Sequence, residues 1–330
     1  MTIKGMLLIL LAAITVWFVW MWWRLARQGK GKFQNDPANK KTWYHTIVAF
    51  IMCFFDTLGI GNFATTTSAF KFRGSLFDEK IPGTLNIGYA IPTIAQAFIY
   101  ITAVPVEAWT LVLMIAASIV GAWLGAGIVA KWSRRKIQIG MGFALLIAST
   151  VLLMQIFATQ QQIDNFVLLH FPVLKPVVSE ITIIFKGGDS TGLHGMLLMV
   201  GLLGNFALGA LMTLGIGLYA PCLILVSLLG MTPGAAFPIM MGSCAFLMPI
   251  SGVRFIKEGS YSLPAAVIMS IAGLPAVLIA AYLIISMNVD KLRWVVLVVV
   301  ILTAIMMLRS AMRERSQQRS PELGAEPQRG

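Results

Sequence analysis

The pentapeptide Thr57-Leu-Gly-Ile-Gly61 recurs unchanged as Thr213-Leu-Gly-Ile-Gly217, 156 positions further along the chain. Both copies lie inside apolar segments, 44–70 and 195–230, that are too long for one ordinary membrane helix. Similarity at a fixed offset is typical of an internal repeat. Because the glycines interrupt both segments, we predict two related halves that each open with a broken helix.

The match between the halves extends beyond the pentapeptide. Three further pairs align at nearly the same offset: Ala64 with Ala220, Gly88 with Gly242, and Ser118-Ile119-x-Gly121 with Ser270-Ile271-x-Gly273. The slow drift of the offset indicates small loop deletions. We therefore place repeat 1 at 44–158 and repeat 2 at 195–308.

The composition indicates a membrane protein. Of 330 residues, 58% are hydrophobic and 12% are charged, about half the charged fraction of a soluble domain. A net charge of +12 can attract nucleic acid, but in a membrane protein Lys and Arg collect in cytoplasmic loops. The uncharged run 6–23 predicts an uncleaved anchor helix. The apolar segments are 4–23, 44–70, 82–101, 106–130, 137–158, 195–230, 234–253, 262–286 and 292–308.

Charge also predicts how the chain crosses the membrane. Residues 24–41 and 131–136 are strongly basic and should both be cytoplasmic. If each broken segment contributes no net crossing, 20 Lys and Arg lie inside and 5 outside, whereas a single crossing for each gives 15 and 10. The first arrangement is preferred, with the N-terminus outside and the C-terminus cytoplasmic. Whether the broken segments are re-entrant hairpins or pairs of short spans stays open.

These observations predict an all-α membrane protein made of two inverted repeats. Each repeat is a Gly-broken helical hairpin followed by three transmembrane helices, and an extra transmembrane helix precedes them. The expected parts are an anchor helix and basic loop (1–43), repeat 1 (44–158), an external loop (159–194), repeat 2 (195–308) and a disordered cytoplasmic tail (309–330).

The breaks are the best candidates for a substrate site, because irregular backbone at membrane depth has to line a cavity or be buried in protein. A helix that starts after a break directs free N–H groups toward it and attracts anions. The alternative is that the glycines only allow close helix packing, and that nearby polar groups cap helices. The predicted substrate-binding residues are Gly59, Gly61, Asn62, Thr65, Thr66, Asn86, Tyr89, Gly215, Gly217, Gly242 and Ser243.

Asp56 is the only acid well inside an apolar segment, three positions before Gly59. A carboxyl group inside a membrane points to function by default, and proton coupling is its natural role. We predict Asp56 as the ion-coupling residue. The alternative is a protonated or locally hydrogen-bonded structural acid.

The sequence lacks the motifs for metal binding, ATP hydrolysis and intramembrane catalysis. None of the three histidines, His45, His170 and His194, forms a metal motif, and no P-loop is present. The three cysteines all lie in apolar segments without metal-ligand spacing. An intramembrane enzyme needs a nucleophile–base pair or a carboxylate dyad. We therefore expect no catalytic residue, metal or cofactor, and no nucleic-acid partner.

The chain resembles the sulfite exporter TauE/SafE permease family over about 44–308. The resemblance rests on the duplicated breaks, on the loop Glu79-Lys80-Ile81-Pro82-Gly83-Thr84-Leu85-Asn86 and on the small-residue span Gly121-Ala-Trp-Leu-Gly125-Ala-Gly127. It implies secondary transport of a small anion such as sulfite, a sulfonate or a related organic acid across a bacterial inner membrane. A passive anion channel is the alternative, since broken helices serve both. The direction of transport, the coupling ion and the oligomeric state, with a homodimer as one option, stay open.

Overall fold

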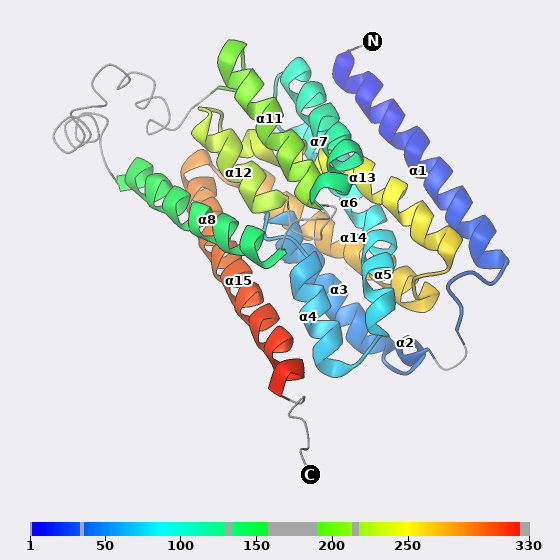
Figure 1. Cartoon of the computed structure of the whole chain (residues 1–330). Coiled ribbons are helices and arrows are strands. Elements are labelled where there is room, and N and C mark those ends of the chain that lie inside the picture. Colours follow the sequence, from blue (N-terminus) through cyan, green and yellow to red (C-terminus); the bar gives the residue numbers. More distant parts are fainter. Residues whose placement is uncertain (1, 34–35, 130–133, 158–189, 213–217, 324–330) are drawn as a thin grey trace.

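The protein is a bundle of helices of very different lengths (Figure 1). The computed structural model describes residues 2–33, 36–129, 134–157, 190–212 and 218–323. The helices are α1 (Ile3–Arg27), α2 (Pro37–Lys40), α3 (Thr42–Thr57), α4 (Phe63–Arg73), η1 (Asp78–Lys80), α5 (Ile81–Gly88), α6 (Ala90–Ala103), α7 (Ala108–Val129), α8 (Arg134–Phe157), α11 (Gly195–Met212), α12 (Tyr219–Leu228), η3 (Pro233–Ala235), α13 (Ala236–Glu258), α14 (Leu263–Ser286) and α15 (Val289–Leu323).

The first glycine-broken segment forms a helical hairpin. Helix α3 ends at Thr57 and α4 begins at Phe63. At 1.5 Å per residue these helices are only about 24 and 17 Å long, less than the roughly 30 Å of a bilayer core. Figure 1 shows both helices on the same side of the break, in the lower half of the molecule. The two helices therefore form a hairpin whose turn is the glycine break.

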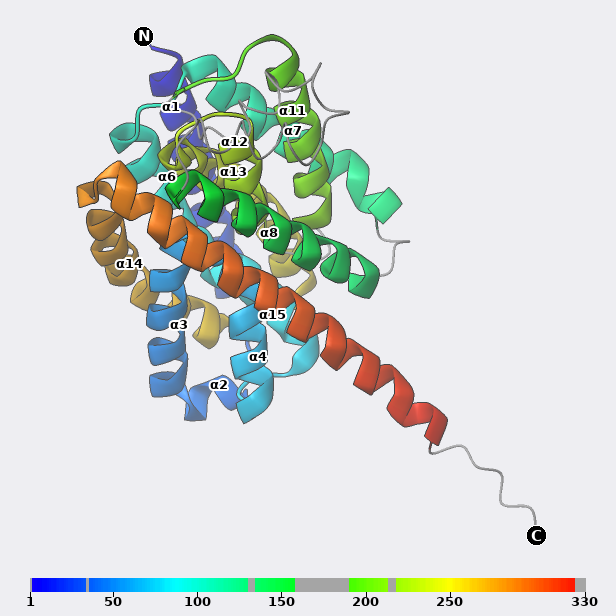
Figure 2. The same cartoon turned by 90° about the vertical axis from the view of Figure 1, so that its left-hand side faces the viewer.

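The second broken segment approaches from the opposite side. Helices α11 and α12 lie in the upper half of both Figure 1 and Figure 2, and α3 and α4 lie in the lower half. The backbone between Met212 and Leu218 lies outside the described residues. In both segments, the helix ends next to the glycines lie toward the middle of the bundle.

Packing between the halves is reciprocal. The most extensive contacts join α3 to α14, α11 to α7, α8 to α15 and α6 to α13. The helix that opens each half thus packs against the helix that follows the central span of the other half. The strength of these cross-half contacts shows that the two repeats share one core.

Small residues allow the closest of these contacts. A Cβ atom on Gly121 of α7 would overlap the backbone oxygen of Phe206 in α11, and one on Gly209 of α11 would overlap the backbone oxygen of Ser118 in α7. The absence of side chains lets the two helix backbones approach, as small residues do between membrane helices. The sequence pattern Gly121-x-x-x-Gly125 thus begins at a real packing contact.

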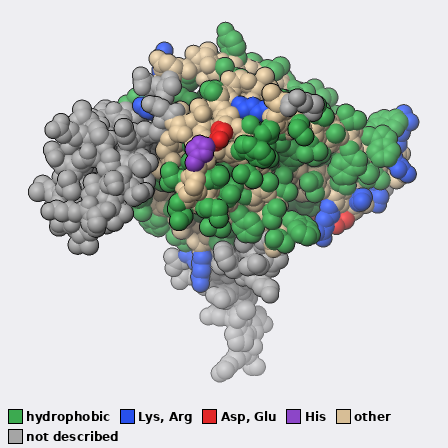
Figure 3. Space-filling model, turned by 90° about the horizontal axis from the view of Figure 1, so that it is seen from above, with side chains coloured by type: hydrophobic (Ala, Val, Ile, Leu, Met, Phe, Trp, Pro, Cys, Tyr) green, Lys and Arg blue, Asp and Glu red, His purple; other side chains and the backbone are tan. Residues whose placement is uncertain are grey.

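Helix α13 lies at the centre and α1 at the edge. In the most apolar stretch of each, 83% of the α13 residues are buried but only 22% of the α1 residues. Within the described residues, α1, α11, the helix through 233–258, α14 and 291–312 are long and apolar enough to cross a membrane. Hydrophobic side chains also cover most of the described surface seen from above (Figure 3).

A clamp at the lower end ties the loop after α1 to the turn between α13 and α14. Tyr261 donates a hydrogen bond to the Lys30 carbonyl at 3.0 Å, and Ser262 donates to the Asp36 carboxylate at 2.6 Å. Burial raises the pKa of Tyr261 to about 12, so its hydroxyl keeps its proton and its donor role near neutral pH. The clamp anchors the extra N-terminal helix to repeat 2.

The end of the chain differs from the sequence prediction. Helix α15 continues to Leu323, beyond the expected end at 308 and into the tail predicted to be disordered. Arg, Glu, Gln and Met in this stretch are good helix formers, which explains the extension. Most of the predicted external loop, 158–189, lies outside the described residues.

Candidate functional site

A cavity of about 70 Å³ lies where the two broken segments meet. Its wall combines the first break with both flanks of the second break, and with residues of α8, α13 and α15. The volume suits a few waters or one small ion. The lining residues are Asp56, Ile60, Gly61, Asn62, Phe63, Ala64, Gln138, Met212, Leu218, Tyr219, Cys244, Met248, Thr303, Met306, Met307 and Ser310.

Glycine makes the first break possible. Gly59 and Gly61 have φ of 102° and 82°, in the left-handed region that other residues rarely adopt. The chain leaves α3 through hydrogen bonds from Gly59 N to the Asp56 carbonyl at 2.8 Å and from Ile60 N to the Phe55 carbonyl at 3.2 Å. The space beside the Gly61 Cα is open, since no atom lies within 4 Å of where its Cβ would be.

Asp56 is held at the cavity wall by donors from two elements, α6 and the first break. Its carboxylate accepts a hydrogen bond from Gln96 Nε2 of α6 at 3.0 Å and another from the backbone N–H of Asn62. The same Gln96 nitrogen donates to Thr57 Oγ1 at 2.8 Å. Only 2% of Asp56 is exposed, so the carboxyl meets solvent through the cavity alone. Both the predicted coupling role and the alternative, a hydrogen-bonded structural acid, are compatible with this environment.

Two helices begin at the cavity. Helix α4 starts at Phe63 after its N-cap Asn62, and α12 starts at Tyr219 after its N-cap Leu218, and no side chain caps either helix. The first-turn N–H groups of such helices lack intrahelical partners and carry partial positive charge. No Lys or Arg lies among the lining residues. Attraction for an anion here therefore comes from helix ends and neutral donors.

Of the predicted site residues, Asp56, Gly61 and Asn62 line the cavity. Gly215 and Gly217 lie outside the described residues. Met212 and Leu218, which flank them, do line the cavity. The described residues on either side of the second glycine pair therefore lie at the same cavity as the first break.

Six other predicted residues lie behind the wall. Gly59 faces Leu223, and Gly242 faces Ile115. Thr65 donates to the Asn62 carbonyl at 3.0 Å, and Thr66 shares a 2.8 Å hydrogen bond with Tyr89. Ser243 lies 3.5 Å from Asn205 Nδ2.

Asn86 is likewise outside the wall. Its Oδ1 accepts a 2.8 Å hydrogen bond from Ser251, and its Nδ2 donates to the Pro82 carbonyl at 2.9 Å. This contact joins α5 to α13. Substrate contact by these seven residues stays a prediction. In this structure six of them join different helices or elements, and Thr65 bonds within the first turn of its own helix.

The sequence interpretation missed four polar lining residues: Gln138, Tyr219, Thr303 and Ser310. Gln138 Nε2 of α8 donates to Ser310 Oγ of α15 at 3.3 Å, which links the last helices of the two halves. Gln138 directly follows the basic run Arg134-Arg135-Lys136 and one apolar residue. From sequence, Gln138 therefore looks like part of the basic loop and is not recognised as a cavity-lining residue.

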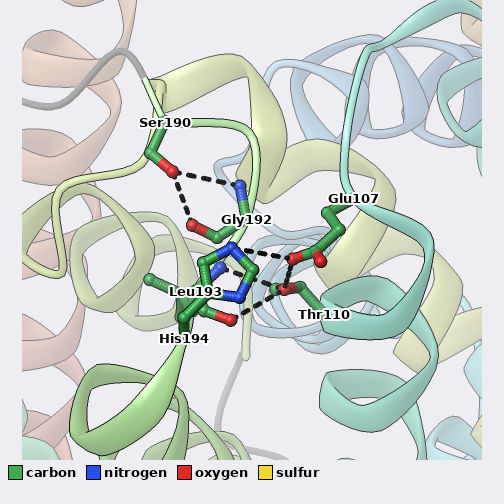
Figure 4. Close-up of polar contacts among 6 residues, drawn as sticks. All are labelled: Glu107, Thr110, Ser190, Gly192, Leu193 and His194. Carbon is green, nitrogen blue, oxygen red and sulfur yellow. Dashed lines mark hydrogen bonds and ion pairs between the residues drawn. The ribbon is translucent and has the colours of Figure 1, made fainter.

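A separate polar cluster closes the upper end of the α7–α11 pair (Figure 4). Thr110 Oγ1 donates to Glu107 Oε2 at 2.7 Å and accepts from the Leu193 N–H at 3.0 Å. His194 Nε2 lies 3.7 Å from the same carboxylate oxygen. This cluster fixes the segment before α11 onto the start of α7, away from the cavity.

A helical bundle with spans of membrane length, a glycine-broken helical hairpin and a cavity in its interior is typical of membrane transport proteins. Comparison with known families identifies the member. The chain matches the family described as Sulfite exporter TauE/SafE over residues 1–152 and 197–329, and it belongs to that family as a multi-pass membrane protein. A search of curated proteins and a search of solved structures found no match.

Proposed function

We propose that this protein is a secondary transporter that moves a small anion across the bacterial inner membrane, driven by protons. The anion is sulfite, a sulfonate or a related organosulfur or organic acid. The observation that supports this most is the meeting of α4 and α12 N-termini with the Asp56 carboxyl at one cavity. Helix N-termini favour anions, and the carboxyl supplies a site for the coupled proton.

Charge repulsion links binding of the proton at Asp56 to binding of the anion. An ionised Asp56 at the wall repels an anion strongly, because water screens little in a buried cavity. Protonation removes this charge and lets the carboxyl O–H donate a hydrogen bond to the anion. The anion therefore binds best to the protonated protein, and each ligand raises the affinity for the other by the same factor.

The inverted-repeat architecture belongs to this proposal. The reciprocal packing of α3 on α14 and of α11 on α7, together with hairpins from opposite sides, supports a pseudo-twofold axis through the cavity. Rocking of one repeat against the other then exposes the cavity to each side in turn. The N-terminus lies outside and the C-terminus in the cytoplasm.

Reconstituted protein separates this proposal from the alternative, a passive anion channel. Proteoliposomes loaded with unlabelled sulfite or sulfoacetate are expected to take up labelled anion faster than empty ones. Uptake is also expected to be faster when the outside medium is more acidic than the inside. Saturable uptake with trans-stimulation supports a transporter, and uptake without trans-stimulation identifies a channel. Equal rates with and without a pH gradient remove proton coupling from the proposal.

Asp56→Asn tests the role of the carboxyl group. The amide keeps the size and can still accept from Gln96, but it cannot take up a proton. We expect proton-driven uptake to fall to the level of empty vesicles, while anion exchange persists. Asp78→Asn is the control, because Asp78 forms an exposed ion pair with Lys71 and neither residue lines the cavity. Proton-driven uptake by the Asp56→Asn variant at the unmutated rate contradicts this assignment.

A further inference from the structure

Sulfur atoms form a large share of the cavity wall. Five lining side chains carry sulfur, and they come from α11, α13 and α15: Met212, Cys244, Met248, Met306 and Met307. Thiol and thioether groups are polarisable and are weak hydrogen-bond partners. A small oxyanion gains little from them. Soft metals, in contrast, prefer such ligands.

Two of these side chains lie close enough to share one ion, and a third follows one helical turn away. Cys244 Sγ lies 3.6 Å from Met212 Sδ. Two sulfur ligands about 2.3 Å from a metal, at bond angles of about 105 to 120°, lie roughly 3.6 to 4.0 Å apart. Met248 follows Cys244 by one helical turn on the same face of α13, and both line the cavity.

We propose that Cys244, Met212 and Met248 form a three-sulfur site for a soft monovalent metal ion, Cu(I), inside the cavity. The site stands independently of the transport activity proposed above. Among the described residues, no three His, Cys, Asp or Glu side chains cluster, so zinc lacks its usual ligand set. Thiolate and thioether donors from two helices match Cu(I) instead.

The charge balance also suits a buried site. Cu(I) binding displaces the Cys244 thiol proton, which leaves through the cavity, and the thiolate and Cu(I) together are neutral. The interior therefore gains no net charge, which avoids the cost of an isolated ion in a membrane. Cys244 is only 2% exposed and hydrogen-bonds with Tyr219. That phenol can donate to the metal-bound thiolate.

The test titrates tag-free, full-length protein in detergent and chloride-free buffer with Ag(I), a redox-inert probe. Cu(I) affinity is measured by competition with a chromogenic chelator under ascorbate. We expect one equivalent of each ion to bind. Cys244→Ser, Met212→Leu and Met248→Leu should each weaken binding at least tenfold, and Met→Leu nearly conserves volume.

Cys222→Ser is the matched control, since Cys222 is fully buried outside the cavity wall and its loss should leave the affinity unchanged. Melting temperatures without metal show whether each variant folds. If Cys244→Ser does not fold, the Met212→Leu and Met248→Leu variants provide the test. Equal loss from Cys222→Ser and Cys244→Ser, or no stoichiometric binding, overturns the site. The sulfur atoms then only pack the cavity wall.

Discussion

Gly59 and Gly61 share a left-handed backbone but face different surroundings. A Cβ on Gly59 would lie 3.2 Å from Leu223 Cδ1, whereas one on Gly61 would meet nothing within 4 Å. Gly59 therefore serves packing, which was the alternative interpretation of the breaks. Gly61 lines the cavity, and its role in substrate binding stays a prediction.

Gly61→Leu tests the open backbone at the cavity. The new side chain would project into a space of about 70 Å³ and fill much of it, so we expect anion uptake to fall at least tenfold with normal membrane insertion. Gly74→Leu is the control, because Gly74 also has a positive φ, 51°, and open space beside it. Both changes carry a backbone cost of about 1–2 kcal/mol. Equal uptake by the two variants shows that the first break has only a packing role.

Gln96 positions the Asp56 carboxyl, the proposed coupling group, because one nitrogen of its amide donates to both Asp56 and Thr57. Gln96→Leu leaves these buried oxygens without that donor, which should lower the free energy of unfolding by about 1–3 kcal/mol. A double-mutant cycle with Asp56→Asn, followed by thermal melting, is expected to show a coupling of about 0.5 kcal/mol or more. Additive effects of the two changes indicate that Gln96 acts without the carboxyl.

At the scale of elements, close contact between α7 and α11 holds the upper hairpin in place. Gly121→Ala forces a methyl group against the Phe206 backbone oxygen, and backbone cannot give way as a side chain can. We expect a loss of about 1–3 kcal/mol, measured as a lower melting temperature in detergent. Gly140→Ala in α8 is the control, because no atom lies within 4 Å of its Cβ position. That change should be neutral or stabilising by about 1 kcal/mol, and equal melting temperatures for the two variants contradict the contact.

At the scale of the whole molecule, charge and architecture make one joint prediction about orientation. The positive-inside rule assigns the basic loops and the C-terminus to the cytoplasm, and hairpins from opposite sides then place the α11–α12 pair outside. We expect a C-terminal green fluorescent protein fusion to fluoresce and a C-terminal alkaline phosphatase fusion to be inactive. With the same reporters fused to the N-terminus, we expect the phosphatase to be active and the fluorescent protein not to fluoresce. Active phosphatase at the C-terminus contradicts the proposed orientation.

The sequence alone determined the class of the protein, its family and the place of the first break. Long apolar segments need helices in a membrane, and a repeated Gly-Ile-Gly inside them has few uses other than a turn or a close contact. Asp56 stood out for the same reason, since a charge in an apolar segment is costly and rare. These are local properties, so periodicity and composition reveal them.

Only the tertiary structure decided which polar residues line the cavity. Thr66 is near the break in sequence, yet it shares a hydrogen bond with Tyr89 behind the wall. Thr303 and Ser310 are distant in sequence, yet they line the cavity with Asp56. The direction of a side chain depends on how helices from the two halves pack. That packing is set by contacts such as Gly121 on Phe206, which link residues too far apart in the chain for a local pattern to record.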